Sequence, residues 1–182
     1  IEFIGPTSDI MEKMGDKIKS KIVSGNAGVK TIPGIQRPIK SEDEAIEFAR
    51  YCGYPVMIKA ADGGGGRGMR IIQKEEDLLE SYRNAKNESL KAFGSDEMFI
   101  EKYIEGPKHI EVQVLGDKYG NIVHLYERDC SIQRRHQKVI EFAPAFALSK
   151  EIRDDICNDA LKIAKSVNYR SVGTLEFLVD KH

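Results

Sequence analysis

Residues 55–72 read PVMIKAADGGGGRGMRII, where an apolar run that carries a lysine enters a glycine-rich turn and a second apolar run leaves it. Both runs are short, contain β-branched residues and are bounded by glycines, as is typical of two strands joined by a loop. Four consecutive glycines lose much conformational entropy when ordered, and a plain hairpin turn needs only one or two. We therefore predict a strand-loop-strand flap whose backbone a ligand approaches closely.

Two known nucleotide motifs do not account for this stretch. Its glycines satisfy the G-x-G-x-x-G spacing, but the dinucleotide fingerprint needs a helix directly afterwards, and residues 69–72 are strand-like. The P-loop pattern also fails, because Met69 stands where its lysine belongs. The remaining interpretation is a flap that folds over a polyphosphate. It would offer backbone N–H donors and the fixed charge of Lys59. A mobile surface loop without a chemical role is the alternative.

The composition indicates a soluble globular protein with one large domain or two small ones. Of the 182 residues 31% are charged and 41% apolar, with a net charge of -1, which disfavours disorder, nucleic-acid partners and a membrane. The three cysteines are far apart and form no zinc spacing or disulfide framework, which favours a reducing compartment, cytoplasmic or in the mitochondrial matrix. The chain begins with Ile1 and stops after an apolar strand, so we expect a piece of a longer protein.

The first thirty or so residues read as helices. Asp16 is predicted to cap a helix over residues 17–26, which places Lys17 near the positive end of that helix. A cation there is unfavourable unless an anion lies alongside, and a solvated surface lysine is the alternative. We expect residues 1–30 to form a helical connector from a preceding domain.

Residues 31–103 are predicted to form a compact α+β lid around the flap. Ser41 and Glu44 form a capping box for a helix that Gly53 ends. The expected order is strand, helix, strand, flap, strand, helix and strand, over residues 31–34, 41–53, 55–60, 62–68, 69–72, 75–92 and 97–103.

Residues 104–182 are predicted to form part of an antiparallel-sheet subdomain. In 108–115, His109, Glu111 and Gln113 alternate with three apolar residues, which indicates a half-buried strand. A hairpin at 117–121 returns the chain, and apolar spacing predicts a helix over 151–167. The last strand, 173–179, turns Glu176 away from its apolar face, and this carboxylate is either a magnesium ligand or partly exposed.

Residues 127–138, ERDCSIQRRHQK, concentrate cationic side chains. They are either a solvated basic loop or a site for an anionic substrate or phosphate. RNA binding is disfavoured, because no aromatic residues interleave with the arginines.

Five motifs then stand together in order: MGDK at 14–17, GGGGRGM at 63–69, EKYIE at 101–105, KHIEVQV at 108–114 and ERDCSIQRRHQKVIE at 127–141. This set resembles the biotin carboxylase component of biotin-dependent carboxylases, a member of the ATP-grasp fold, over essentially the whole chain. Residues 124–141 are most similar to the enzymes that carboxylate pyruvate, and acetyl-CoA and propionyl-CoA carboxylases carry close versions. Carbamoyl-phosphate synthase, another ATP-grasp enzyme that uses bicarbonate, is the runner-up, and the RRHQK run does not favour it.

The resemblance implies an α+β ATP-grasp fold and phosphorylation of bicarbonate by ATP with Mg2+ or Mn2+, followed by carboxylation of biotin on a carrier. It implies the nucleotide-binding residues Lys17, Lys59, Gly64, Gly65, Gly66, Glu101, Lys102, Ile104, His109, Gln133 and His136. Lys17, Lys59 and the glycines are implied for the phosphates, Glu101 and the backbone of Lys102 and Ile104 for adenine, and the remaining three residues for ribose and phosphates. Lys138 is implied for the γ-phosphate region or bicarbonate and Glu176 for the metal, so these two carry the catalytic roles.

The family pattern is incomplete in this chain. The second magnesium carboxylate, and the arginine and glutamate expected around bicarbonate and biotin, would follow His182, and no Ala-Met-Lys-Met biotinylation sequence occurs. The implied partners are bicarbonate, a biotin carrier domain or protein, a carboxyltransferase domain and further copies in a homo-oligomer. The acyl acceptor stays open, as does a nucleotide-binding module that is inactive in isolation.

Overall fold

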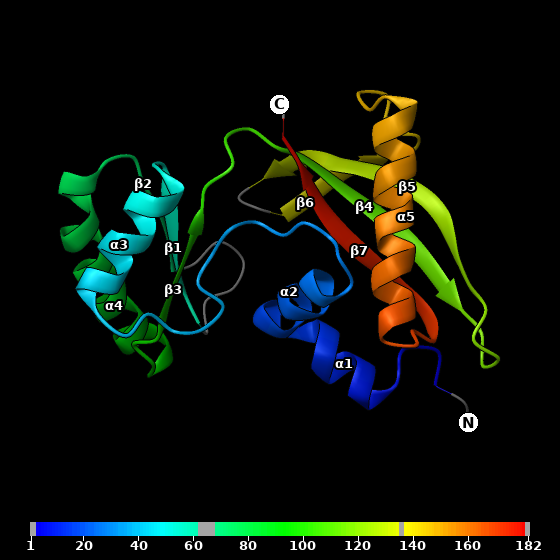
Figure 1. The fold of residues 1–182 in the computed structure, drawn as a ribbon, viewed down its shortest axis with the longest axis horizontal. Coiled ribbons are helices and arrows are strands. Elements are labelled where there is room, and N and C mark those ends of the chain that lie inside the picture. Colours follow the sequence, from blue (N-terminus) through cyan, green and yellow to red (C-terminus); the bar gives the residue numbers. More distant parts are fainter. Residues whose placement is uncertain (1–2, 62–67, 135–136, 181–182) are drawn as a thin grey trace. The chain divides into compact units, whose positions relative to one another are not determined.

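The computed structural model describes residues 3–61, 68–134 and 137–180. They form two compact units: the first holds residues up to 31, 106–134 and those from 138 onward, and the second holds 32–105 with Gln137 (Figure 1). Each unit has its own hydrophobic core and combines helices with a sheet, which confirms the predicted α+β class. The assignment of connector, lid and C-terminal subdomain stays a prediction.

The second unit is a three-stranded antiparallel sheet in the order β2-β1-β3, covered by two helices. Its elements are β1 (Val56–Ala60), β2 (Met69–Ile72), β3 (Met98–Lys102), α3 (Glu42–Cys52) and α4 (Leu78–Phe93), with a 3-10 turn at Glu75–Asp77. Alternate residues of β1 are buried in the core with both helices, so Lys59 lies on the opposite face. The predicted pair of strands is confirmed, with Lys59 opposite Met69. Residues 62–67, which hold most of the flap, lie outside the described residues.

The start of α3 follows the predicted capping chemistry with one difference. The Ser41 hydroxyl accepts a hydrogen bond from the Glu44 N–H at 3.2 Å, and Gly53 ends the helix with a φ of 74°. The Glu44 carboxylate accepts from the N–H of Lys40 at 2.6 Å rather than from that of Ser41. Hydrogen bonds from Arg37 and then from Lys40 lower the pKa of Glu44 to about 2.

The predicted strand at residues 31–34 is wrong. A single isolated bridge joins Gly34 to Glu101, and the Pro33 carbonyl accepts from the Lys102 N–H at 2.8 Å. Because Pro33 has no N–H to return, the segment follows β3 without forming a ladder.

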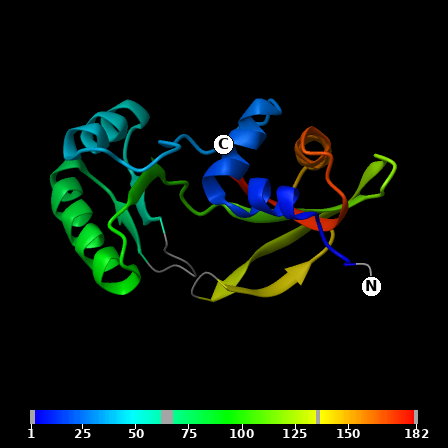
Figure 2. The ribbon, with the colours of Figure 1, turned by 90° about the horizontal axis from the view of Figure 1, so that it is seen from below.

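The first unit is a four-stranded sheet in the order β6-β5-β4-β7, with β4 antiparallel to both neighbours. Its elements are α1 (Ser8–Gly15), α2 (Lys17–Asn26), β4 (Lys108–Gly116), β5 (Ile122–Arg134), β6 (Gln137–Phe142), α5 (Lys150–Ser166) and β7 (Ser171–Val179). Figure 2 shows α2 and α5 on the same side of this sheet, where Ile110, Val112 and Val114 are buried. The other face carries polar residues of several strands, among them Glu111, Arg128 and Glu176.

The Asp16 cap of α2 is as predicted, and α5 has a cap that the sequence analysis did not name. The Asp16 carboxylate accepts from the N–H groups of Ile18 and Lys19, both at 2.8 Å, and so begins α2. Ser149 caps α5 by accepting from the N–H of Ile152 at 3.3 Å. No helix among the described residues is long and apolar enough to span a membrane.

Most of the basic run lies in strands, so the loop alternative for it is wrong. Strand β5 continues to Arg134, and its two acidic residues, Glu127 and Asp129, point to the helix side of the sheet. Glu127 and Asp129 are each 1% exposed. The Glu127 carboxylate accepts from Arg153 Nε at 2.7 Å and from the Ala145 N–H at 3.0 Å. Residues that look like a solvated loop in the sequence are therefore held in a buried strand by an arginine of α5.

A β-bulge separates the hairpin end of β5 from its acidic part. The register between β4 and β5 shifts between Val112 and Val114, and Tyr126 on the bulged strand has a φ of 63°. Beyond the shift, Arg128 lies directly opposite Glu111, on the face away from α5.

Gly116, at the end of β4, lies close to the backbone of the loop that precedes β7. A Cβ added there would lie 2.1 Å from the carbonyl oxygen of Tyr169. Gly116→Ala is therefore expected to destabilise the protein by about 1 to 3 kcal/mol, because strand and loop must move apart. The matched control is Gly25→Ala on α2, where a Cβ meets nothing within 4 Å and stability is expected to stay level or rise by up to about 1 kcal/mol. Urea unfolding measures both, and equal midpoints would contradict the close approach.

Candidate functional site

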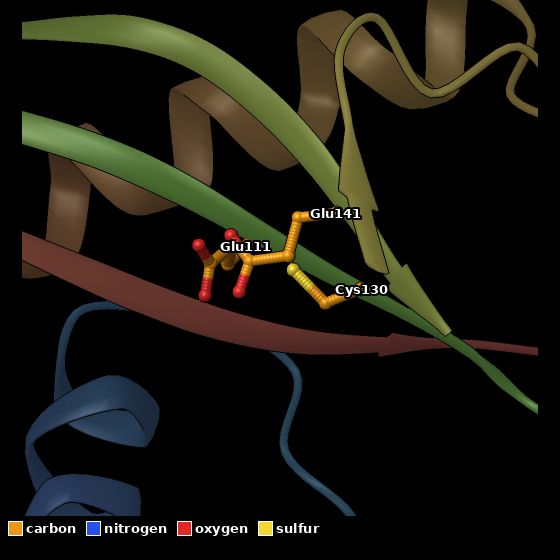
Figure 3. Close-up of side chains that lie close together, drawn as sticks. All are labelled: Glu111, Cys130 and Glu141. Atoms are coloured by element: carbon orange, nitrogen blue, oxygen red, sulfur yellow. The ribbon is translucent and has the colours of Figure 1, made fainter. Parts of the chain in front are cut away.

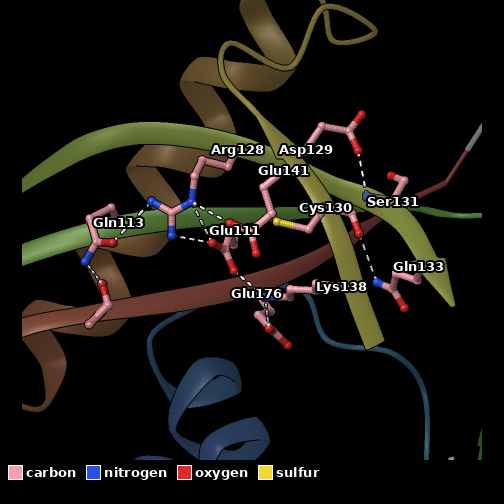
Figure 4. Close-up of polar contacts among 11 residues, drawn as sticks. Glu111, Gln113, Arg128, Asp129, Cys130, Ser131, Gln133, Lys138, Glu141 and Glu176 are labelled. Carbon is pink, nitrogen blue, oxygen red and sulfur yellow. Dashed lines mark hydrogen bonds and ion pairs between the residues drawn. The ribbon is translucent and has the colours of Figure 1, made fainter. Parts of the chain in front are cut away.

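Polar side chains from all four strands of the first unit gather on the sheet face opposite α5 (Figure 4). Strand pairing places them there, because residues directly opposite each other point to the same face. Glu111 of β4 lies opposite Arg128 of β5 and Glu176 of β7. The cluster comprises Glu111, Gln113, Arg128, Cys130, Lys138, Glu141 and Glu176.

Glu111 is the centre of this cluster. It is 4% exposed, and each of its carboxylate oxygens is bound by a cation. Arg128 donates to Oε1 from Nε at 2.7 Å and also from Nη2, while Lys138 Nζ donates to Oε2. Burial opposes the charge, but the hydrogen bonds from Lys138 and Arg128 outweigh it and lower the pKa of Glu111. The carboxylate is therefore ionised and fixed at both oxygens.

Lys138 is held between two carboxylates. Besides Glu111, its Nζ donates to Glu176 Oε1 at 2.5 Å. Burial acts to lower the pKa of Lys138, but the hydrogen bonds to Glu111 and Glu176 raise it above the ordinary value. The side chain is thus an ammonium at neutral pH, suited to binding an anion and unsuited to accepting a proton.

Further hydrogen bonds hold the guanidinium of Arg128 in place. Arg128 Nη1 donates to Gln113 Oε1 at 3.2 Å, and Gln113 Nε2 donates to the Gly173 carbonyl of β7 at 2.7 Å. Glu141 Oε2 lies 3.5 Å from Arg128 Nε. The guanidinium is therefore oriented by both neighbouring strands, β4 and β6, and Gln113 of β4 is itself anchored on β7.

A cavity of about 240 Å³ opens on this face. Its lining comprises His109, Ile110, Glu111, Cys130, Lys138, Glu176, Phe177 and Leu178. Burial, and then the charge of Glu111, raises the pKa of the Cys130 thiol to about 11. The thiol is protonated at neutral pH and is a poor nucleophile there.

Glu111, Cys130 and Glu141 present three possible metal-ligand atoms within 4.8 Å of one another (Figure 3). The two carboxylates already lie against Arg128 and Lys138, and the thiol keeps its proton. Positive charge from the protein occupies this position, so we assign no metal to the trio.

Glu176 meets the requirements for a magnesium ligand better. Its side chain is 67% exposed, and one oxygen binds Lys138. Its second oxygen has no hydrogen-bond partner among the residues that the structure describes. Magnesium is typically held by one or two carboxylates together with phosphate oxygens and water, so this single free carboxylate oxygen fits the ion.

The second unit brings two of the implied nucleotide-binding residues together. Lys59 Nζ donates to the Glu101 carboxylate, on the sheet face away from the helices. Lys102 Nζ donates to the carbonyls of Gly53 and Tyr54, both at 3.0 Å. Ile104 follows β3 in an irregular, half-buried segment. Lys59 is thus a partly buried cation that already has a counter-ion.

Other implied residues are placed individually. The half-buried His109 lines the cavity, and its N–H donates to Ser131 Oγ at 3.0 Å. Gln133 is half-buried, and its Nε2 donates to the Cys130 carbonyl at 3.0 Å. The side chain of Lys17, together with Gly64, Gly65, Gly66 and His136, lies outside the described residues.

Sequence reasoning did not single out Glu111, Gln113 or Arg128 as site residues. Glu111 carried a related signal, a carboxylate between His109 and Gln113 on the polar side of an alternating strand. Opposite a cationic run such as 127–138, that signal indicates a buried ion pair, which is what the structure contains.

Comparisons with known proteins identify the family of this chain. The family described as carbamoyl-phosphate synthase L chain, ATP binding domain, matches residues 16–182. Pyruvate carboxylase of Bacillus subtilis (strain 168) is 55% identical over 179 residues, which are 98% of this chain and 16% of that protein. Mitochondrial pyruvate carboxylase of Rattus norvegicus is 54% identical over 182 residues, which are 100% of this chain and 15% of that protein.

Two solved structures are similar over 100% of the chain. Biotin carboxylase of Campylobacter jejuni, in a β,γ-ATP complex, has a TM-score of 0.90 and 50% identity, with 41% of that chain covered. The biotin carboxylase domain of Hydrogenobacter thermophilus 2-oxoglutarate carboxylase, with MgADP, ADP and bicarbonate, has a TM-score of 0.89 and 54% identity, with 40% covered.

The chain belongs to the carbamoyl-phosphate synthase L chain ATP-binding domain family, with the ATP-grasp fold of biotin carboxylases. Within that family it matches the biotin carboxylase part of biotin-dependent carboxylases, the pyruvate carboxylases among them. It spans 15 to 16% of the length of the two pyruvate carboxylases.

Proposed function

We propose that this chain takes part in the ATP-dependent carboxylation of biotin, with bicarbonate as the source of the carboxyl group. The observation that carries the proposal is the Lys138 ammonium, held between Glu111 and Glu176 at the mouth of a cavity. The nucleotide and bicarbonate named for the Hydrogenobacter domain support the same pair of ligands here.

In the proposed reaction an oxygen of bicarbonate attacks the γ-phosphorus of ATP, and ADP leaves with the electron pair of the broken bond. The carboxyphosphate then gives its carboxyl group to a ring nitrogen of biotin on a carrier. The departing phosphate takes the electron pair of the broken C–O bond and accepts the proton that the nitrogen loses. Phosphoryl transfer depends on positioning and charge neutralisation more than on covalent catalysis. Lys138 is assigned to stabilise the transferring phosphoryl group or bicarbonate. Bound Mg2+ or Mn2+ supplies further neutralisation, and Glu176 is assigned to hold it.

The nucleotide contacts are assigned to the residues that the resemblance implies. Lys59 and the glycine run are proposed to contact phosphates, and residues 101–104 to contact adenine. His109, Gln133 and His136 are proposed to reach ribose and phosphates, and Lys17 a phosphate. In this assignment Lys59 exchanges part of its contact with Glu101 for a phosphate when ATP binds.

Lys59→Ala is expected to raise the KM for MgATP about 10-fold or more and to lower turnover in the natural full-length protein, because one charge-assisted contact of roughly 1.5 to 3 kcal/mol is lost. Lys86→Ala is the matched control, since Lys86 pairs with Asp96 at 3.1 Å on the surface of the same unit. Steady-state ATP cleavage measures both. An unchanged KM in the Lys59 variant would remove the phosphate assignment.

The proposed carboxyl acceptor beyond biotin is pyruvate. Full-coverage matches to pyruvate carboxylases support it, but the Hydrogenobacter 2-oxoglutarate carboxylase domain is as similar in sequence as the rat enzyme. We therefore infer a 2-oxo acid acceptor and place acetyl-CoA or propionyl-CoA second. The proposed partners are a biotin carrier, a carboxyltransferase and further copies of the same protein, in the cytoplasm or the mitochondrial matrix.

The test is transfer of labelled bicarbonate to biotin by the natural full-length protein, with MgATP present or omitted. Label is expected in acid-labile carboxybiotin only with ATP, together with phosphate release that depends on bicarbonate. The 182 residues alone are expected to bind MgATP weakly and to show no such phosphate release, because Glu176 then lacks a second metal carboxylate. ATP cleavage by the full-length protein without any carboxyl transfer would favour a module that only binds and hydrolyses nucleotide.

A further inference from the structure

We propose that Arg128 is a positioning residue for Lys138: it fixes Glu111, and Glu111 in turn fixes the ammonium at the cavity. The inference rests on the function proposed above and adds a residue to which the family resemblance gives no role. It concerns orientation, since Arg128 itself is not among the residues that line the cavity.

The two carboxylate oxygens of Glu111 bind different cations. Oε1 receives two donors of Arg128, and Oε2 receives Lys138. Because Nε and Nη2 of Arg128 converge on Oε1, they fix the position of that oxygen, and the carboxylate can turn only about it. The positions that Oε2 can reach, and with them the position of Lys138 Nζ, are therefore restricted by Arg128.

Arg128 is in turn fixed by contacts that a simple counter-ion would not need. Gln113 accepts from Nη1 at 3.2 Å and is anchored on the Gly173 carbonyl at 2.7 Å. Gly173 lies on β7, the strand that also carries Glu176, the second partner of Lys138. The chain of polar contacts thus begins and ends on β7. Both carboxylates around Lys138 are therefore positioned by contacts to the same strand (Figure 4).

A guanidinium suits this task better than an ammonium. Its donors lie in one plane at fixed angles, so it can hold Oε1 and Gln113 together, whereas a lysine offers one compact charge on a flexible stem. Glu111 needs only charge neutralisation to stay buried, and Lys138 already supplies part of it. The simultaneous contacts of the guanidinium with Glu111 Oε1 and with Gln113 are the additional feature that positioning requires.

The experiment compares variants of the natural full-length protein in bicarbonate-dependent ATP cleavage, expressed per folded molecule. Arg128→Met is expected to lower kcat about 10-fold or more, since a misplacement of roughly 1 Å can reduce a rate 100-fold, and to change the KM for MgATP less than about twofold. Arg128→Lys is expected to fall between Arg128→Met and the wild type. In a Lys138→Met background, Arg128→Met is expected to have no further effect, because the group it positions is gone.

Arg83→Met is the matched control. Arg83 also makes a two-point contact with a glutamate, at 2.8 and 2.7 Å from Glu42, but on the surface of the second unit. Its kcat and KM are expected to equal those of the wild type.

The outcomes separate the inference from the proposed function. An unchanged kcat per folded Arg128→Met molecule, or losses that simply add in the double variant, would overturn the positioning role and leave the function intact. Full activity in Lys138→Met would overturn the assigned role of Lys138 itself. If Arg128→Met does not fold, Arg128→Lys decides, since it retains the charge and wild-type kcat in it would show that charge alone suffices.

Discussion

Replacement of Lys138 by methionine is expected to lower bicarbonate-dependent ATP cleavage by about 100- to 1,000-fold in the natural full-length protein. Removing one preorganised charge or donor at a developing anion has an effect of this size. The effect should exceed that of Lys59, because Lys138 is held in place by two carboxylates before any substrate arrives. An ammonium fixed in this way does not have to reorganise during the reaction.

The control is Lys162→Met, which removes a lysine that pairs with Asp159 at 2.7 Å on the surface of α5. Its rate is expected to equal that of the wild type. Phosphate release with and without bicarbonate gives both rates, and circular dichroism establishes that each variant is folded. A Lys138→Met protein that retains more than about a tenth of the rate would remove Lys138 from the chemistry.

Arg153→Met is expected to destabilise the protein by about 3 to 5 kcal/mol, the largest stability effect that we expect of a single substitution here. Arg153 is the cation of the Glu127 carboxylate, which is 1% exposed. Arg153 also donates to the Ala145 carbonyl at 3.3 Å, and Glu127 Oε2 is buried without a partner among the described residues. Loss of the guanidinium therefore leaves a buried charge with one remaining donor, the Ala145 N–H.

Urea unfolding at neutral pH measures the effect. Replacing the whole pair, with Glu127→Leu added to Arg153→Met, is expected to recover part of the loss, because no charge then remains buried. Recovery stays incomplete, since the Ala145 N–H loses its acceptor. Arg83→Met provides the exposed comparison and is expected to change stability by less than about 1 kcal/mol. A similar small change in Arg153→Met would show that Glu127 is not dependent on its partner.

The sequence alone predicts the local features of this fold well. Asp16 and Gly53 mark helix ends by short-range hydrogen bonding and backbone conformation, and both act as predicted. The alternation in β4 gives its buried face, because a period of two depends only on neighbours along the chain. The strand predicted at residues 31–34 was wrong, because an extended segment resembles a paired strand in the sequence. Pro33 has no N–H with which to form the ladder.

The rest depends on residues that are distant in the sequence. Glu127 and Asp129 look like loop residues, and only Arg153 on α5 explains why Glu127 lies inside a strand. Lys138 and Glu176 were predicted as catalytic residues and are hydrogen-bonded to each other, but their roles stay predictions. Glu111 and Arg128 join them through strand register, which no property of a single segment reveals.

The bulge at Tyr126 determines which charges meet at the site. Near the hairpin, Gly116 of β4 pairs with Ile122 of β5. After the register shift, Glu111 pairs with Arg128. If the hairpin register continued without the shift, Glu127 would face Glu111, and Arg128 would enter the apolar layer beneath α5. One extra residue therefore converts repulsion between like charges into attraction. The pairing of charges at this site therefore depends on whether the number of residues between the hairpin turn and Arg128 is odd or even.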